Sequence, residues 1–113
     1  MGQYQNIVGK KLGSGVAGSA YSTLYTAPDL TRTYIKDINV CNVTANNHNG
    51  YLHIVPSGGS PSISNAIMYN YLLGGHDIYN WRGLAIMNAG DTIQVKADVA
   101  DCLAFYISGA DAT

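Results

Sequence analysis

The sequence predicts an all-β domain, an antiparallel two-sheet β-sandwich of jelly-roll type with about eight strands. The first observation is composition: Ile, Val, Thr and aromatic residues are abundant, only 12% of residues are charged, and every acidic residue is Asp. Residues that build exposed helix faces are therefore scarce. The second is spacing, because turn signals recur roughly every 8 to 15 residues. The third is length, since 113 residues suffice for one domain with one core.

The chain begins with a segment that we expect to differ from the body. Residues 1–20 predict a strand or arm packed outside the main body, with a flexible Gly/Ser/Ala-rich linker over Gly13–Ala20. The first strand of the body is Tyr21–Thr26, which ends at Ala27-Pro28-Asp29. Thr33–Thr44 is the longest strand candidate, and its centre is apolar on both faces, which predicts a central strand.

The middle of the chain predicts a hairpin and two strands. Asn49-Gly50 is a strong hairpin signal because both residues tolerate a positive φ. Tyr51–Val55 alternates, with Leu52 and Ile54 on one face. Asn65–Leu73 fits either a strand or a helix by period, and its tyrosines favour a strand.

The last third of the chain predicts four more strands. They are two short strands over Asp77–Asn80 and Leu84–Met87 that flank Trp81-Arg82-Gly83, then Thr92–Lys96 after a turn at Asn88–Asp91, and finally Cys102–Ser108. The sandwich domain then spans residues 21–109, and residues 110–113 form a loose tail.

Charge excludes two classes of partner. The 6 basic and 7 acidic residues give a net charge of −1, without the clustered basic surface that nucleic acid or an anionic membrane requires. No apolar run approaches a membrane span, and the first residues lack the pattern of a signal peptide. We therefore expect synthesis in the cytosol.

The catalytic inventory predicts no enzyme, no catalytic residues, no cofactor and no metal, because the Asp and His residues form no recognised motif. His48 and His53 could share a metal across their turn, with His76 as a third ligand, but nothing in the sequence places a carboxylate or Cys beside them. We interpret them as unrelated surface or loop histidines.

The two cysteines, Cys41 and Cys102, lie in apolar runs and have no metal-binding spacing. This predicts two reduced, buried thiols, whereas a disulfide between them would require neighbouring strands and an oxidising compartment. Asn42-Val43-Thr44 is a glycosylation sequon, which we interpret as a chance match at a strand end.

Aromatic residues predict an interaction surface. Nine Tyr and one Trp cannot all be buried in so small a domain, and both types are enriched at protein interfaces. Aromatic pairing across strands is the alternative explanation. The strongest interface candidate is Tyr79, Asn80, Trp81 and Arg82, which would suit a protein hot spot or a sugar-stacking platform. The candidate interface also includes Tyr4, Ile7 and Val8 of the arm.

Several strings carry a family resemblance in their joint order and spacing. They are Leu24–Pro28, Lys36–Asn42, Val55–Pro61, Ala89–Ala97 and Ile107–Gly109. Over residues 21–109 the chain resembles a family of small β-sandwich proteins encoded among the virion genes of tailed bacteriophages. The resemblance implies a structural virion component, attached to the head or tail surface, with no catalytic site.

The resulting functional prediction is a non-enzymatic bacteriophage virion protein, either a capsid decoration or stabilising subunit or a tail-associated accessory. Its partners would be other virion proteins and copies of itself, and its location would be the virion. The alternative is a carbohydrate- or receptor-binding β-sandwich module, in which a glycan contacts the aromatic residues.

Overall fold

The computed structural model describes residues 7–113 and forms two four-stranded sheets. The strands are β1 (Ile7–Val16), β2 (Ser22–Thr26), β3 (Arg32–Asn42), β4 (His48–Val55), β5 (Ala66–Leu73), β6 (Ile78–Met87), β7 (Thr92–Ala97) and β8 (Leu103–Ala112). A single 3₁₀ turn, η1 (Ile63–Asn65), precedes β5. No helix in residues 7–113 has the length and apolarity needed to cross a membrane. The predicted all-β class and strand number are confirmed.

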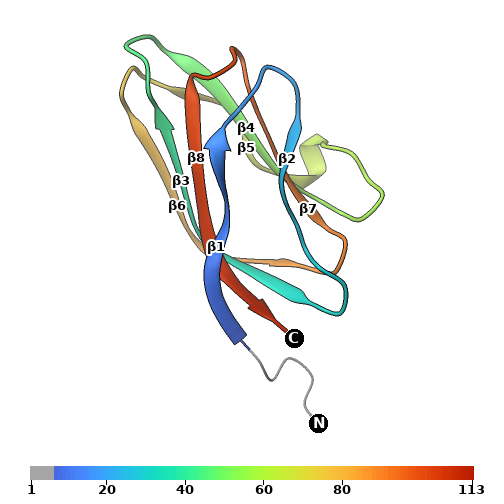
Figure 1. Ribbon diagram of the computed structural model, residues 1–113. Helices are drawn as coiled ribbons and strands as arrows, with labels where there is room; N and C mark the ends of the chain where they lie inside the picture. The colour runs from blue at the N-terminus through green and yellow to red at the C-terminus, as the bar shows by residue number, and fades with distance from the viewer. Residues whose placement is uncertain (1–6) are drawn as a thin grey trace.

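The strand order is that of a jelly roll. Sheet A has the order β1-β8-β3-β6, sheet B has the order β2-β7-β4-β5, and all neighbours are antiparallel. Successive strands alternate between the two sheets except at β4 and β5, as in a double-sheet jelly roll. Figure 1 shows the two layers, with the start of β1 and the end of the chain at the same end of the sandwich.

The core lies between the two sheets, where inward side chains from both sheets pack together. β7 shows the pattern most simply, since its alternate residues Ile93, Val95 and Ala97 are fully buried. This confirms the alternation predicted for that segment. The largest fully buried apolar side chains are Phe105, Ile35, Ile38, Leu52, Met68, Met87, Ile93, Leu103, Ile107, Val40 and Val55.

β3 is a central strand, as predicted, but its apolar residues do not divide between two faces. Ile35, Ile38 and Val40 are all buried. The register against both β6 and β8 shifts between Ile35 and Asp37, which places a bulge at Lys36. The extra residue reverses the alternation, so that odd- and even-numbered apolar residues both face the core.

The hairpin predicted at Asn49-Gly50 is wrong. β3 and β4 lie in different sheets, and Gly50 lies inside β4, paired with Tyr71 and Ala97. A Cβ at Gly50 would lie 2.7 Å from Cδ1 of Leu103. Glycine at this position therefore leaves room for the Leu103 side chain of β8 and does not serve a turn conformation.

The region around Trp81 also differs from the prediction. β6 is one continuous strand, and its residues pair with β3 on both sides of an irregularity opposite the Lys36 bulge. Gly83 suggested a break, but the missing side chain instead leaves room for the Trp81 ring, which would lie 3.1 Å from a Cβ at Gly83. An isolated strand glycine marks close packing in this case.

The structure extends the sandwich beyond the predicted domain boundaries at both ends. Residues 7–16 pair with β8 along their length, and Ala17 is fully buried, so the Gly/Ser/Ala-rich stretch is part of the fold. At the other end, β8 continues to Ala112 instead of ending in a loose tail at Gly109. The start of β1 is therefore paired with the end of β8, where Ile7 lies opposite Ala112.

Candidate interaction surfaces

The outer face of sheet B carries an aromatic cluster, which we define as Tyr21, Tyr51, His53 and Tyr69. The ring centroids of Tyr21 and Tyr51 are 6.2 Å apart, and those of Tyr51 and Tyr69 are 5.4 Å apart. His53 lies 5.1 Å from Tyr21 and 6.1 Å from Tyr69. All four contacts are edge-to-face, the arrangement that aromatic quadrupoles favour.

His53 is the buried base of the aromatic cluster, with no exposed surface. The Asn65 amide donates to the Ser60 carbonyl, and its Oδ1 accepts from the Ser62 N–H, which fixes the orientation of the amide. Oδ1 therefore also accepts from Nδ1 of His53 at 2.8 Å. Nε2 of His53 is then the acceptor for the Tyr21 hydroxyl at 3.0 Å. These bonds hold the Tyr21 ring in a defined orientation.

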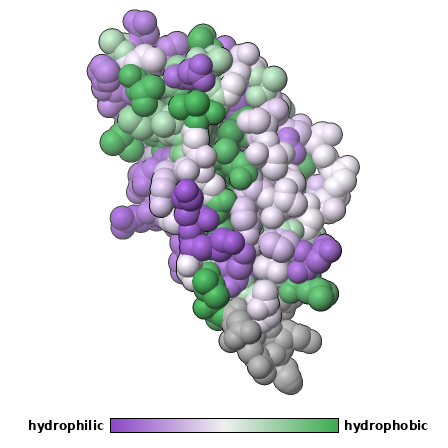
Figure 2. All heavy atoms as spheres, viewed as in Figure 1, coloured by the Kyte–Doolittle hydropathy of each residue, from purple (hydrophilic) through white to green (hydrophobic). Residues whose placement is uncertain are grey.

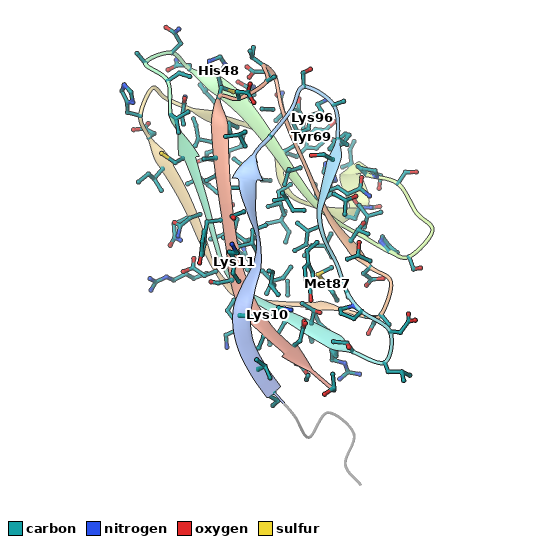
Figure 3. All side chains as sticks on the ribbon, viewed as in Figure 1. Lys10, Lys11, His48, Tyr69, Met87 and Lys96 are labelled. Carbon is teal, nitrogen blue, oxygen red and sulfur yellow. The ribbon has the colours of Figure 1, made fainter. Side chains whose placement is uncertain are left out.

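Polar groups surround the aromatic cluster. The Lys96 ammonium lies 4.6 Å from the Tyr51 ring centroid and 5.0 Å from that of Tyr21, within cation–π range. The Tyr51 hydroxyl donates to Oδ1 of Asn70 at 2.9 Å. Burial, with added repulsion from Tyr51 and Tyr69, raises the pKa of Tyr21, so its phenol stays neutral at physiological pH. Figure 3 labels Tyr69 on β5 and Lys96 on β7 in the same part of sheet B.

The outer face of sheet A is built differently, in cross-strand rows that mix apolar, polar and charged side chains. One row contains Val16, Ala104, Cys41 and Ile78. Val16 and Ile78 expose 52% and 67% of their surface, so this row forms an apolar patch. Figure 2 shows apolar residues gathered at the end of the visible face that lies farthest from the start of β1.

The four-residue interface candidate on β6 does not form one surface. Tyr79 and Trp81 pack against the core. The centroid of the Tyr79 ring lies 4.8 Å from that of Tyr71, and this contact bridges the edge strands β6 and β5 of the two sheets. Asn80 and Arg82 alternate with them, so they face outward. The structure therefore assigns the two rings a packing role, while the interface role of the segment stays a prediction.

Asn80 and Arg82 belong to a polar group on the outer face of sheet A. The Asn80 amide donates to Oδ1 of Asp37 at 2.7 Å and to Oδ1 of Asn39 at 3.0 Å. Nε of Arg82 lies 3.9 Å from Asp37, and the Arg82 side chain is 80% exposed. These contacts connect β6 to β3 across the sheet surface.

The arm residues of the candidate interface lie partly in the described chain. Ile7 and Val8, at the start of the edge strand β1, are 66% and 58% exposed. Tyr4 lies outside the described residues. An edge strand with exposed apolar side chains is a surface on which another chain can pair.

The three histidines lie in separate environments. His53 is buried under the tyrosines, and His76 lies in the β5–β6 turn with a left-handed φ of 61°. Nδ1 of His48 lies 3.0 Å from Oδ1 of Asp98, and Sγ of Cys102 lies 3.8 Å from the same oxygen. Sequence reasoning missed this cluster, because Asp98 and Cys102 are far from His48 in sequence and reach it only through the pairing of β4 with β7.

Asp111 accepts hydrogen bonds from side chains of three different strands. It accepts from the hydroxyls of Tyr25 (2.6 Å) and Thr33 (2.7 Å) and from the Lys10 ammonium (3.1 Å). Burial favours a raised pKa for Asp111, but the hydrogen bonds from Tyr25, Thr33 and Lys10 outweigh it and lower the pKa below its usual value. Because Tyr25 belongs to sheet B and the other partners to sheet A, Asp111 ties the sheets together.

Neither cysteine is in a disulfide. Cys102 is buried, as predicted, but Cys41 is only half-buried because it lies on the outer face of sheet A, opposite Ala104. Asn42 of the sequon is fully buried, and its amide donates to the carbonyls of Asn46 and Leu73. This side chain is a structural element of the strand end, in agreement with a chance match.

Comparison with known proteins gives a likeness in fold. No protein-family model and no curated protein matches the chain. Among solved structures, the chain is similar to a chain in the structure of infectious bursal disease virus, Gx strain, with a TM-score of 0.53 and 7% sequence identity. The match covers 95% of this chain and 32% of that chain, so this chain spans about a third of its neighbour's length. The jelly-roll fold is therefore shared with a viral protein.

Proposed function

We propose that the chain is a non-enzymatic structural protein of a virion, and more specifically a capsid decoration, capsid-stabilising or tail-associated subunit of a tailed bacteriophage. The observation that carries the proposal is the jelly-roll strand order, in a fold similar to that of a chain of infectious bursal disease virus. The phage assignment rests on the resemblance of residues 21–109 to small virion proteins of tailed bacteriophages.

The surface of the molecule supports a function based on protein packing. Few residues are charged, and large apolar side chains are exposed along the edge strands β1 and β6, among them Ile7, Val8, Ile78, Leu84 and Ile86. Edge strands with exposed apolar side chains are surfaces on which another chain can pair. We infer that copies of this chain and other virion proteins contact these edges.

The first test measures the native mass of the purified full chain by light scattering over a range of concentrations, followed by co-sedimentation with particles of the encoding phage that lack it. We expect a stable oligomer or saturable binding to particles. A monomer at every concentration that also fails to co-sediment would overturn the proposal.

A matched pair of variants locates the surface. Ile7→Lys combined with Val8→Lys places charge on the β1 edge, and we expect it to weaken oligomerisation or particle binding at least tenfold. Leu30→Lys is the control, because Leu30 is 90% exposed but lies in the turn between β2 and β3 and not on the β1 edge. Equal effects of both changes would argue against β1 as the contact.

A second candidate function, glycan binding, is favoured by the aromatic cluster on sheet B. Tyr69 is 52% exposed, and the neighbouring Lys96 and Asn70 supply polar groups of the kind that hold sugar hydroxyls. A glycan screen of wild-type protein and Tyr69→Ala tests this function. Binding that Tyr69→Ala abolishes, with unchanged oligomeric state, would favour it over the structural role of this face.

A further inference from the structure

A cluster of three different metal-ligating groups lies at one end of the sandwich. His48 at the start of β4, Asp98 in the loop after β7 and Cys102 before β8 each offer one ligand atom, and these atoms lie within 4.8 Å of one another. Figure 3 labels His48 at this end of the molecule. In residues 7–113 it is the one group of this kind.

The donor set suits one class of ion. Imidazole nitrogen, thiolate sulfur and carboxylate oxygen are the ligands of Zn²⁺, at roughly 2.0 to 2.3 Å from the metal. Ligand atoms at these distances in a tetrahedron lie about 3 to 4 Å apart. The distances from Asp98 Oδ1 to His48 Nδ1 (3.0 Å) and to Cys102 Sγ (3.8 Å) already match that spacing.

The backbone holds the ligands in place. Oδ2 of Asp98 accepts from the Asn49 N–H at 3.1 Å, which leaves Oδ1 directed toward His48 and Cys102. The Asp98 N–H donates to the Asn49 carbonyl at 3.0 Å, which ties the loop to β4. Such outer contacts orient metal ligands and reduce the ordering that binding would require.

The cluster is also accessible to an ion. Cys102 is buried and the His48 side chain is only 15% exposed, but the Asp98 side chain is 39% exposed. An ion can therefore enter from the side of Asp98, and a water molecule can complete a four-coordinate shell on that side. Three protein ligands with one solvent ligand is an established Zn²⁺ arrangement.

We propose that His48, Asp98 and Cys102 bind one Zn²⁺ ion through Nδ1, Oδ1 and Sγ. As the Zn–S bond forms, the Cys102 thiol releases its proton to solvent, and its hydrogen bond to the Val99 carbonyl is lost. His48 gives up the proton that Nδ1 shares with Oδ1 of Asp98 and takes the tautomer with its proton on Nε2. The ion links the loop between β7 and β8 to β4, so its role is to stabilise this end of the sandwich. The inference does not depend on the proposed virion function.

The test titrates the purified, reduced full chain with Co²⁺ as a spectroscopic probe and then displaces it with Zn²⁺. We expect one equivalent of Co²⁺ to give the visible bands of a tetrahedral site together with a thiolate-to-metal charge-transfer band. We also expect Zn²⁺ to raise the melting temperature. Absence of stoichiometric binding by the wild-type chain would overturn the proposal.

The chain offers matched controls for two of the three ligands, His48 and Cys102. His48→Gln and Cys102→Ser should each weaken Zn²⁺ binding at least tenfold, while Cys41→Ser and His76→Gln should leave it unchanged. Cys102 is buried, so circular dichroism must show that Cys102→Ser is folded, and His48→Gln tests the site independently if it is not. Unaltered binding by His48→Gln, or loss of binding by Cys41→Ser, would contradict the assignment.

Discussion

The outer faces of the two sheets arise from the same alternation of side chains, yet they are organised differently. On sheet B, Tyr21 and Tyr69 contact the buried His53 through their rings, and Tyr21 also hydrogen-bonds to it. Tyr51 joins the cluster through ring contacts with these two tyrosines. On sheet A, side chains of mixed size lie in cross-strand rows, and the polar contacts around Asp37 are at the exposed surface. The side chains on the face of sheet B are therefore preorganised by their mutual contacts, whereas the polar contacts on the face of sheet A are exposed to solvent.

This difference separates two ways in which the molecule can contact a partner. A preorganised aromatic surface loses little side-chain entropy on binding, and therefore suits recognition of a defined ligand or side chain. A face bordered by edge strands with exposed apolar side chains suits packing against a repeated copy. We therefore expect substitutions on sheet B to affect stability through coupled contacts, and substitutions on the face of sheet A to affect it little.

The largest effect is expected from His53→Ala, which removes the base of the aromatic cluster. The change leaves a cavity and removes the partners of the Tyr21 hydroxyl and Asn65, so we expect a loss of about 3 kcal/mol in the free energy of unfolding. Urea denaturation measures it. His76→Asn, which tolerates the left-handed backbone at that position, is the control and should change stability by less than about 0.5 kcal/mol. A small effect of His53→Ala would mean that the tyrosines do not depend on it.

The second-largest effect on stability is expected from Asp111→Asn, which tests the link between the two sheets. The amide keeps the shape of the carboxyl but loses its charge, and its NH₂ group faces three donors. We therefore expect the free energy of unfolding to fall by about 2 kcal/mol at neutral pH. Asp29→Asn, in an exposed turn, is the control. Equal stability of wild-type and Asp111→Asn protein would show that the two sheets are held without this carboxylate.

The same variant has a defined pH dependence. Because the folded-state pKa of Asp111 is lowered, its stabilising contribution is complete above the unfolded-state pKa of about 4 and is lost as the pH falls through the folded-state pKa. The difference in stability between wild type and Asp111→Asn should therefore shrink as the pH is lowered from 5 towards 2. A difference that stays constant over this range would contradict the role of the charge.

A smaller effect is expected from Tyr21→Phe, which keeps the ring and removes its hydroxyl. The lost hydrogen bond to the buried His53 should cost about 1 kcal/mol. Tyr106→Phe is the matched control on the outer face of sheet A, where the ring is 50% exposed, and should cost close to nothing. Equal costs for the two changes would remove the contrast between the faces.

The sequence predicted the parts of the fold that depend on local pattern. The alternation of Thr92–Lys96 and the turn at Asn88–Asp91 are both present in the structure, since neighbouring residues determine them. The role of Gly50 and the bulge at Lys36 depend on which strands become neighbours in the sheets, so local pattern misread both. The approach of Asp98 to His48 and the burial of His53 beneath the tyrosines are long-range in the same way.

The smallest effect is expected from Arg82→Ala on the face of sheet A. Its guanidinium is 3.9 Å from Asp37 and largely exposed, so solvent screens the pair, and we expect a change of less than about 0.5 kcal/mol in the free energy of unfolding. The measurement becomes informative when it is combined with particle binding. If Arg82→Ala leaves stability unchanged but weakens binding, the polar group on sheet A contacts a partner. If both stay unchanged, Ile7 and Val8 on β1 remain the contact to examine, because they are exposed at the opposite edge of the same sheet.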